Sequence, residues 1–309
     1  MKNPTPDINI VKTVAAKYLK NIVSVERTQK GQSTYVFRVM TRTETFYIRF
    51  LPEDASFAAE VLAHNILLER GVVVPRVIAW EHRNEETGLS IMITEEIPGI
   101  PVQDEWPSKN ARGILNEAGR QITLVHEISV DGFGWIDRNS YHTLKGVESS
   151  YRDFFNDGLV DGLEMLNQFD FSDTDIIRIS ELVEKAGRIT NTENSVLVHG
   201  DFDSSQILYQ NGKYTGMIDF GEIRGCNRLV DLATCLLFDG RKRPLAYEFI
   251  LEGYQETVQL SDNDLYGIEL FVLYRTVLGM RTKESRPRLA DFFYTRARDQ
   301  LERINKLYG

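Results

Sequence analysis

The sequence predicts an α+β fold with two unequal lobes, and three observations support this prediction. Residues 22–97 are dominated by short segments rich in β-branched and aromatic residues, with one amphipathic helical pattern at 55–70. Beyond residue 101 the apolar spacing is mostly helical. The two parts meet at Pro98-Gly99-Ile100-Pro101, which interrupts both helices and strands. We therefore expect a strand-rich N-terminal lobe of residues 1–97 with one main helix, followed by a helical C-terminal lobe of residues 98–309.

The expected elements of the N-terminal lobe follow from local periodicity. Helices are expected at 7–20 and 55–70, and Gly71 marks the end of the second. Strands are expected at 23–25, 33–39, 45–50, 72–80 and 89–97. The loop that contains Gly31, Ser33 and Thr34 leads into the second strand. Such a loop can present N–H groups and hydroxyls to phosphates, although most loops of this kind are only turns.

Most of the C-terminal lobe is predicted to be helical. Helices are expected at 108–129, 147–168, 173–190, 229–238, 246–257, 265–281 and 289–307, with a turn at 131–135. Ser172 and Asp175 form a capping-box pattern at the start of the third of these helices. His126 lies near the end of the first helix, where the helix dipole favours a cation, and we expect it to cap that helix.

Charge and composition limit the partners of the chain. The 309 residues include 36 basic and 45 acidic side chains, a net charge of −9, which disfavours nucleic acid as the main partner. This charge suits a cationic small molecule, although it is also ordinary for a cytosolic protein. The two cysteines, Cys226 and Cys235, match no zinc pattern, and we expect them to be reduced and structural. No signal peptide or bilayer-spanning stretch is apparent, so we expect a cytoplasmic protein, as a monomer or a homodimer.

Residues 196–222, VLVHGDFDSSQILYQNGKYTGMIDFGE, are the most informative stretch of the sequence. Asn211-Gly212 lies between two short apolar segments, and this dipeptide predicts a tight β-hairpin. The hairpin would bring the loop containing Asp201 near the segment that ends at Asp219, so that both carboxylates face one cleft. Two facing carboxylates suit acid–base catalysis or the binding of a hard cation. Alone, either aspartate would as readily cap or close a turn.

Gln206 lies between the two aspartates at the expected start of a strand, and its amide oxygen is a candidate third ligand for Mg²⁺. A hinge at Pro98-Gly99-Ile100-Pro101 would leave the backbone groups of Glu95 to Ile97 facing the cleft between the lobes.

The central motifs resemble those of the aminoglycoside phosphotransferase family, which comprises small-molecule kinases related in fold to protein kinases. The family pattern H-G-D-x-x-x-x-N-I-L, hairpin, I-D-F/W and D-L-A corresponds here to HGDFDSSQIL, MIDFGE and Asp231-Leu232-Ala233. Weaker similarities, LVHEI at 124–128 followed by GFG at 132–134, extend the resemblance over nearly the whole chain. It implies a protein-kinase-like fold, with an antiparallel sheet and one main helix in the first lobe and mostly helices in the second.

The resemblance also assigns roles to residues of this sequence. Asp201 would orient the substrate hydroxyl and accept its proton, and Asp219 would hold Mg²⁺ against the phosphates of ATP or GTP. Gln206 stands where the family usually has Asn, so a second metal site could be weakened. The remaining nucleotide-binding residues would be Arg49 with Glu60 for the phosphates, Gly31, Ser33 and Thr34 above them, and Glu95 to Ile97 for the base.

The predicted acceptor is a small hydroxylated molecule. There is no H-R-D or A-P-E motif, and residues 222–230 leave no room for a peptide-docking segment. An aminoglycoside-type antibiotic is the leading candidate; a metabolic kinase of a sugar, amino alcohol or amino acid and a nucleotide-binding pseudokinase are the alternatives. Four acidic residues, Asp203, Glu222, Asp231 and Asp239, would draw a polycation or be ordinary surface, and Asp231 is more simply a hydrogen-bond anchor.

Overall fold

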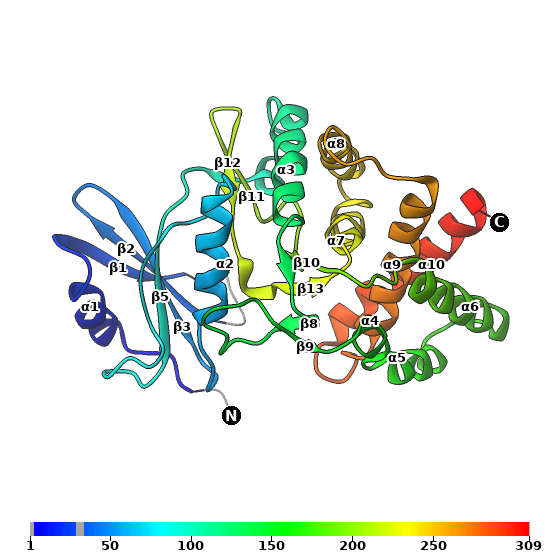
Figure 1. Ribbon diagram of the computed structural model, residues 1–309, viewed down its shortest axis with the longest axis horizontal. Helices are drawn as coiled ribbons and strands as arrows, with labels where there is room; N and C mark the ends of the chain where they lie inside the picture. The colour runs from blue at the N-terminus through cyan, green and yellow to red at the C-terminus, as the bar shows by residue number, and fades with distance from the viewer. Residues whose placement is uncertain (1–2, 29–33, 309) are drawn as a thin grey trace.

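A computed structural model describes residues 3–28 and 34–308, and it has the two-lobed α+β architecture expected from the sequence (Figure 1). The N-terminal lobe is a five-stranded antiparallel sheet of order β1-β2-β3-β5-β4 with two helices. Its elements are α1 (Ile8–Ala16), β1 (Ile22–Arg27), β2 (Tyr35–Thr41), β3 (Thr45–Leu51), α2 (Ala58–Glu69), β4 (Val77–Glu81) and β5 (Ser90–Glu95).

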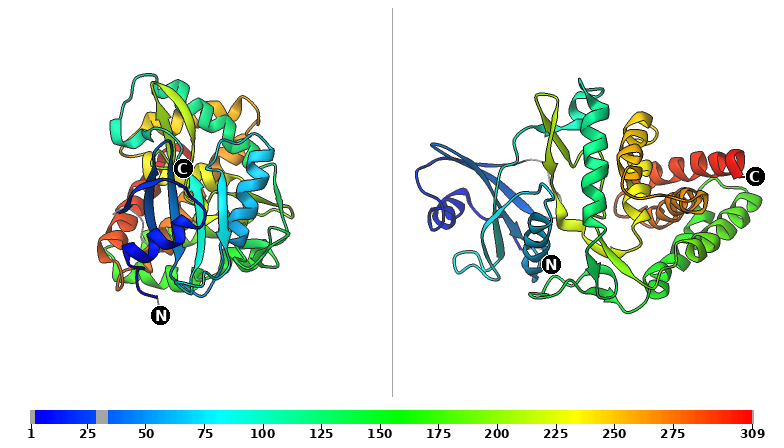
Figure 2. Two further views of the ribbon diagram at one scale, coloured as in Figure 1. Left: turned by 90° about the vertical axis from the view of Figure 1, so that its left-hand side faces the viewer. Right: turned by 45° about the horizontal axis from the view of Figure 1, so that its top comes forward.

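The two faces of this sheet bury different partners. One face packs on α1 through a core that includes Val11, Phe37 and Ile48. Phe57 and Val61 pack with Met92 in a second, smaller cluster. Other residues of α2 join the core of the C-terminal lobe, so this helix lies between the sheet and the second lobe (Figure 2). The position of α2 therefore depends on both lobes.

The C-terminal lobe combines eight helices with two small sheets in the described chain. One sheet has the order β7-β10-β13-β8-β9 and the other β12-β11-β6. The strands are β6 (Ile100–Pro101), β7 (Ser129–Val130), β8 (Phe133–Ile136), β9 (Gly146–Glu148), β10 (Ser195–Val198), β11 (Ile207–Gln210), β12 (Lys213–Met217) and β13 (Arg224–Cys226). The helices are α3 (Ala111–Val125), α4 (Tyr151–Asn156), α5 (Leu159–Met165), α6 (Asp173–Ile189), α7 (Leu229–Asp239), α8 (Pro244–Gln255), α9 (Asp262–Met280) and α10 (Pro287–Tyr308), with 3-10 turns η1 (Val102–Glu105), η2 (Leu166–Gln168) and η3 (Phe220–Glu222).

The hairpin predicted around Asn211-Gly212 is present as β11 and β12. Asn211 and Gly212 both have positive φ, 53° and 73°, as a type I′ turn requires, and Gln210 pairs with Lys213 across it. The capping box at Ser172 and Asp175 is also confirmed.

Three local expectations were wrong for identifiable reasons. Residues 131–135 are not only a turn, because Gly134 pairs with Gly225 in a sheet and β8 begins at Phe133. Residues 147–168 are not one helix, because Gly158 adopts a left-handed φ of 66° and separates α4 from α5. The strand expected at 72–80 begins only at Val77, after Pro75.

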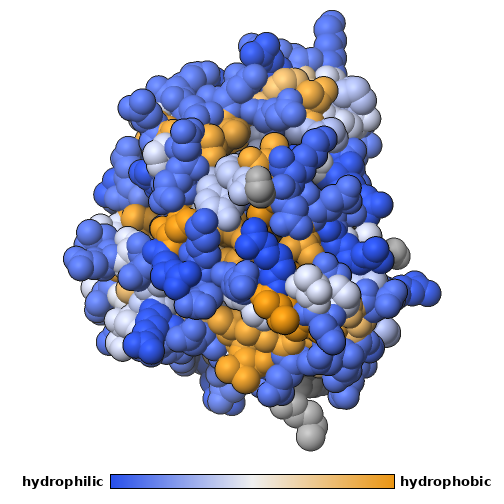
Figure 3. Space-filling model, turned by 90° about the vertical axis from the view of Figure 1, so that its right-hand side faces the viewer, coloured by the Kyte–Doolittle hydropathy of each residue, from blue (hydrophilic) through white to orange (hydrophobic). Residues whose placement is uncertain are grey.

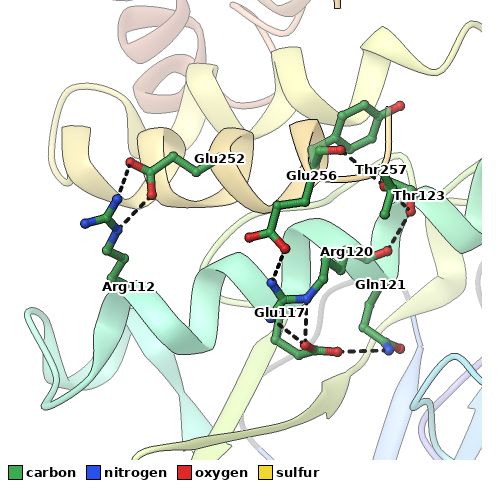
Figure 4. Close-up of polar contacts among 9 residues, drawn as sticks. Arg112, Glu117, Arg120, Gln121, Thr123, Glu252, Glu256 and Thr257 are labelled. Atoms are coloured by element: carbon green, nitrogen blue, oxygen red, sulfur yellow. Dashed lines mark hydrogen bonds and ion pairs between the residues drawn. The ribbon is translucent and has the colours of Figure 1, made fainter. Parts of the chain in front are cut away.

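Helices α3 and α8 pack closely and are joined by paired charges (Figure 4). Arg112 binds Glu252 at 2.9 Å, and Arg120 binds Glu256 at 2.7 Å. Their axes approach at two glycines: a Cβ on Gly119 or on Gly253 would collide with the backbone of the other helix. Close packing of this kind fixes the position of α3 against α8.

The face formed by the C-terminal helices carries several apolar patches (Figure 3). Figure 3 shows that face as mostly hydrophilic, with separate hydrophobic patches. Within the described ranges, the helices are too short or too polar to cross a bilayer. Cys226 and Cys235 are buried and free, as expected.

Candidate active site

A cavity of about 710 Å³ lies between the two lobes and collects most of the residues singled out in the sequence. Its walls come from the N-terminal sheet, from α2, and from the loop and hairpin that follow β10. The predicted residues that line it are Thr34, Arg49, Glu60, Glu95, Ile97, Asp201, Gln206 and Asp219. Gly31 and Ser33 lie outside the described residues. Residues far apart in the chain thus meet in one cleft.

Arg49 lies between two carboxylates. It projects from β3, its Nη1 forms an ion pair with Glu60 of α2, and its Nη2 lies 3.8 Å from Asp219 Oδ1. Glu60 is only 8% exposed, so its pairing with Arg49 is shielded from solvent. Burial alone would lower the pKa of Arg49, but Glu60 and Asp219 raise it above its ordinary value. The guanidinium is therefore a permanent cation held at the edge of the cavity.

Asp201 follows the β10 strand and lines the cavity from the C-terminal lobe. Gln206 Nε2 donates a hydrogen bond to Asp201 Oδ2 at 3.3 Å, which leaves the amide oxygen of Gln206 directed elsewhere. Burial raises the pKa of Asp201, and the nearby carboxylates Asp219 and Glu222 raise it further, while His199 and Arg275 lower it. A carboxyl with a raised pKa in a cleft is a typical proton acceptor.

Asp219 is presented by a strained backbone rather than by the end of a strand. Strand β12 stops at Met217, and Asp219 has the left-handed conformation φ 65°, ψ 57°, which is uncommon for a residue other than glycine. Its carboxylate is 54% exposed. Strain of this kind is commonly found at functional sites, where the surrounding structure holds it.

Aromatic packing holds the chain on both sides of Asp219. The Phe220 ring contacts His199 at 4.5 Å and His64 at 5.5 Å between ring centroids. His199 Nε2 also lies 2.9 Å from the carbonyl oxygen of Ile218. These contacts connect α2, the loop after β10 and the turn at Asp219 in one packed cluster. Sequence reasoning did not identify His64.

Asp231, at the start of α7, holds the loop that carries Asp201. Its carboxylate is completely buried and accepts hydrogen bonds from the backbone N–H groups of His199 and Gly200, both at 2.8 Å. His126 Nε2 lies 3.0 Å from the same carboxylate, and His126 Nδ1 lies 3.1 Å from the hydroxyl of Tyr254. The expectation that Asp231 is an anchor is thus supported. His126 is the C-cap residue of α3, as expected, and its ring binds this carboxylate in addition.

A second buried aspartate holds the following residues of the same loop. Asp239, at the end of α7, accepts hydrogen bonds from Ser204 N at 2.8 Å and Ser204 Oγ at 2.7 Å. Arg243 pairs with the same carboxylate at 2.6 Å. Asp203 accepts from Ser205 N at 2.6 Å, and burial raises the pKa of Asp203 to about 6. Both aspartates are therefore engaged within the protein.

The segment between the lobes lines the same cavity as the loop that carries Asp201. Glu95, Glu96 and Ile97 all contribute to the wall. The side chain of Glu95 is bound by Arg76, with Arg76 Nε at 3.0 Å, and the side chain of Glu96 is bound by Arg38 at 3.1 Å. Because the carboxylates of Glu95 and Glu96 are bound to arginines, the backbone groups of this segment are the ones available to bind a ligand.

The donor set at Asp219 and Gln206 fits Mg²⁺. This ion prefers oxygen ligands and is commonly held by one or two carboxylates together with substrate phosphates. Asp219 supplies an exposed carboxylate and Gln206 an amide oxygen on the same cavity. Among the described residues, no group of three or more His, Cys, Asp or Glu side chains is arranged to hold a metal ion.

The fold is that of the kinase-like phosphotransferases. A crystal structure of a thermostable mutant of aminoglycoside phosphotransferase APH(4)-Ia, in ternary complex with AMP-PNP and hygromycin B, superposes with a TM-score of 0.70 at 16% identity. The superposition covers 94% of this chain and 97% of that one.

Sequence comparison identifies the family directly. Residues 24–264 match the model of the phosphotransferase enzyme family, and the chain belongs to that family. It is 26% identical over 186 residues to an aminoglycoside 3'-phosphotransferase of Streptomyces fradiae and 26% identical over 210 residues to one of Streptomyces ribosidificus. These alignments cover 59% and 65% of this chain, and 65% and 72% of the relatives' own lengths.

Proposed function

We propose that this protein transfers the γ-phosphoryl group of ATP or GTP to a hydroxyl of a small molecule. The observation that supports this best is the meeting, in one interlobe cavity, of Asp201, Asp219 and the Arg49–Glu60 pair. Phosphoryl transfer requires mostly positioning and charge stabilisation, so a proton acceptor, a metal-binding carboxylate and a phosphate-binding cation are the expected minimum. We propose that the boundary between the lobes lies at residues 97 and 98. Residues from both sides of this boundary line the cavity.

In the proposed reaction the acceptor oxygen attacks the γ-phosphorus while its hydroxyl proton passes to Asp201. The bond from the γ-phosphorus to the oxygen bridging to the β-phosphate breaks, and the nucleoside diphosphate leaves with that electron pair. Arg49 binds phosphate oxygens and is oriented by Glu60. Asp219 and Gln206 would hold Mg²⁺, and the bound ion would neutralise charge on the phosphates.

The nucleotide base is assigned to the wall formed by Glu95 to Ile97, and Thr34, with Gly31 and Ser33, to the phosphate side. The AMP-PNP in the APH(4)-Ia complex supports a nucleotide donor for a protein of this fold.

The names of the relatives make an aminoglycoside-type antibiotic the first acceptor to test. A second candidate, a hydroxylated metabolite, is favoured by the pairing of acidic side chains: Asp231 and Asp239 are completely buried and bonded internally, so neither offers charge to a polycation.

A coupled assay of ADP or GDP release, run with Mg²⁺ and a panel of hydroxylated acceptors, tests the proposal. We expect release that depends on one acceptor class and a phosphorylated product visible by mass spectrometry. Nucleotide binding without transfer to any acceptor would instead identify a pseudokinase.

A further inference from the structure

A loop of the C-terminal lobe reaches the N-terminal lobe. Residues 137–145, the interlobe loop, connect β8 to β9, and this connection extends from the second lobe toward the first (Figure 1). Its base is held in the C-terminal lobe, because Leu144 is buried in the core there and Asp137 N donates to Lys145 O at 2.8 Å. The part of the loop between these anchors is the part that meets the other lobe.

Two side chains of the interlobe loop contact the N-terminal lobe. Arg138 Nη1 lies 2.9 Å from Glu53 Oε2, in the segment between β3 and α2. The hydroxyl of Tyr141 lies 2.9 Å from His82 Nδ1, and the Tyr141 ring lies 5.8 Å from the Trp80 ring between centroids. An ion pair, a hydrogen bond and an aromatic contact therefore join the two lobes at this place.

These contacts lie at one end of the N-terminal sheet, and the chain connection to the second lobe lies at the other. Strand β5 begins at Ser90, which pairs with Leu51 at the end of β3, and it ends at Glu95. The segment that connects the lobes follows Glu95, whereas Glu53 lies just beyond Leu51. His82 follows the end of β4 that pairs with the start of β5. The two ends are separated by the six residues of β5, or about 20 Å.

Hydrogen bonds hold the lobes together at the end near the chain connection as well. Val73 N accepts no backbone partner there but donates to Gln121 Oε1 at 3.0 Å, and Val73 O accepts from Met217 N at 2.9 Å. Val73 lies just before β4, whose first residue, Val77, pairs with Thr94 near the end of β5. A rotation of the lobes about this side would therefore move the opposite end of the sheet most, where the interlobe loop makes its contacts.

The interlobe loop also borders the cavity. Ile136 and Arg138 line it, and Ile136 N donates to Ile223 O at 3.3 Å, in the segment that follows Asp219. Arg49 enters the cavity from the N-terminal sheet and Asp219 from the C-terminal lobe, and their side chains lie 3.8 Å apart. A movement of one lobe against the other changes this distance directly. Contacts that fix the lobes therefore fix the cation relative to the carboxylate.

We propose that the interlobe loop holds the two lobes closed and thereby places Arg49 against the same phosphates as Asp219. Glu53, Tyr141 and His82 do not line the cavity, so they are positioning residues that act through the spacing of the lobes. The effect on the reaction rests on the proposed phosphoryl transfer, whereas the effect on the spacing of the lobes does not.

Two spin labels measure this spacing. Both native cysteines are buried, so the labels are attached at Lys12→Cys on α1 and Arg152→Cys on α4, two exposed positions. Double electron–electron resonance of the ligand-free protein should give one narrow distance distribution. Glu53→Arg, alone and with Tyr141→Ala, should add a population at longer distance. The open fraction should rise about tenfold in the combined variant, because all three contacts are lost.

A charge swap and a matched variant complete this experiment. Arg138→Glu in the Glu53→Arg background restores the ion pair with its sign reversed, and it should restore the narrow distribution. Glu86→Arg makes the same change in the ion pair of Lys17 and Glu86, which lies within the N-terminal lobe, and it should leave the spacing unchanged. None of these side chains is buried, so the melting temperatures should stay close to the wild type. A distribution that stays narrow in the combined variant, or that the charge swap does not restore, would overturn the inference.

Titration calorimetry of AMP-PNP with Mg²⁺ tests the positioning role without an acceptor. If only the closed form brings both lobes to the phosphates, Kd rises in inverse proportion to the closed fraction, so a variant that is closed about half of the time should bind about twofold more weakly. The Kd of Glu86→Arg should equal that of the wild type. A longer lobe distance with an unchanged Kd would show that the interlobe loop does not position Arg49, and would overturn the inference.

The acceptor panel of the proposed function separates the two proposals. Lobe spacing and AMP-PNP affinity that depend on the interlobe loop, without transfer to any acceptor, would support this inference and refute the kinase activity. Transfer by the wild type, with lobe spacing unchanged in every variant, would do the opposite. Unchanged spacing and no transfer would overturn both.

Discussion

Asp231 and Asp219 are the same residue type placed within one small region, yet their surroundings are opposite. Asp231 is completely buried and accepts hydrogen bonds from two backbone N–H groups, with the ring of His126 beside it. Asp219 is 54% exposed, and its carboxylate lies 3.8 Å from the guanidinium of Arg49. The carboxylate of Asp231 is therefore fully hydrogen-bonded inside the protein, whereas most of the carboxylate of Asp219 is accessible to a ligand.

The pKa of the hydrogen-bonded carboxyl of Asp231 and the pKa of the cavity-lining carboxyl of Asp201 shift in opposite directions. Burial alone would raise the pKa of Asp231, but the hydrogen bond and charge of His126, with the N–H of Gly200, hold it below its ordinary value. Asp201, in contrast, has a raised pKa because of burial and the nearby carboxylates. The comparison teaches that hydrogen-bond completeness, rather than residue type, separates an aspartate that maintains the loop from one that serves chemistry.

The largest effect is expected from Asp201→Asn. The amide cannot accept the hydroxyl proton, so kcat should fall by about 10²–10⁴-fold. Nucleotide affinity, measured by calorimetry, and the melting temperature should stay close to the wild type, because Asp201 makes few internal contacts. Turnover within a few-fold of the wild type would show that another group accepts the proton.

The same substitution at Asp231 and Asp219 tests the comparison itself. Asp231→Asn replaces an acceptor oxygen beside two N–H donors, and we expect a loss of about 3–5 kcal/mol in the free energy of unfolding. Asp219→Asn should change it by about 0.5 kcal/mol or less while transfer is lost, because that carboxylate is exposed. Urea unfolding measures both, and equal destabilisation by the two variants would remove the distinction.

The lowered pKa of Asp231 gives this prediction a pH dependence. A depressed pKa in the folded state contributes stability above the ordinary pKa of Asp, and that contribution is lost as pH falls toward the folded value. Asp231→Asn should therefore lose stability less steeply than the wild type below about pH 4.

Asp201 and Asp219 could be identified from the sequence because local patterns predict where each of them lies. His199-Gly200-Asp201 directly follows an apolar strand, and the Asn211-Gly212 turn predicts the hairpin that leads to Asp219. The α+β fold class follows from the change in hydrophobic periodicity near residue 98. The break at Gly158 was missed because periodicity does not reveal a left-handed residue.

His64 was missed for a different reason. It belongs to α2, and only tertiary packing brings its ring against Phe220, which lies far away in the sequence. No local pattern marks this residue.

A smaller effect is expected from Glu60→Gln, which breaks the Arg49–Glu60 pair on the cleft side of the comparison. The pair orients Arg49 rather than building the fold, so the KM for nucleotide should rise about tenfold with little change in kcat. Glu69→Gln, at the exposed end of α2, is the matched control. A loss of stability without a change in nucleotide KM would place Glu60 with Asp231 as a structural residue.

The smallest effect is expected from Glu222→Gln, measured as the pH profile of kcat/KM for the acceptor. A base acts only when ionised, so activity falls as pH drops through the pKa of Asp201. Burial raises that pKa most, and Asp219 and Glu222 add to it. Removing the charge of Glu222, which also frees Arg224, lowers the pKa, so the acid limb should move to lower pH. Glu252→Gln on α8 should leave the limb in place. An acid limb that does not move, or that moves to higher pH, would mean that the raised pKa of Asp201 is not what limits the reaction. The two classes of aspartate would then differ in burial alone and not in chemistry.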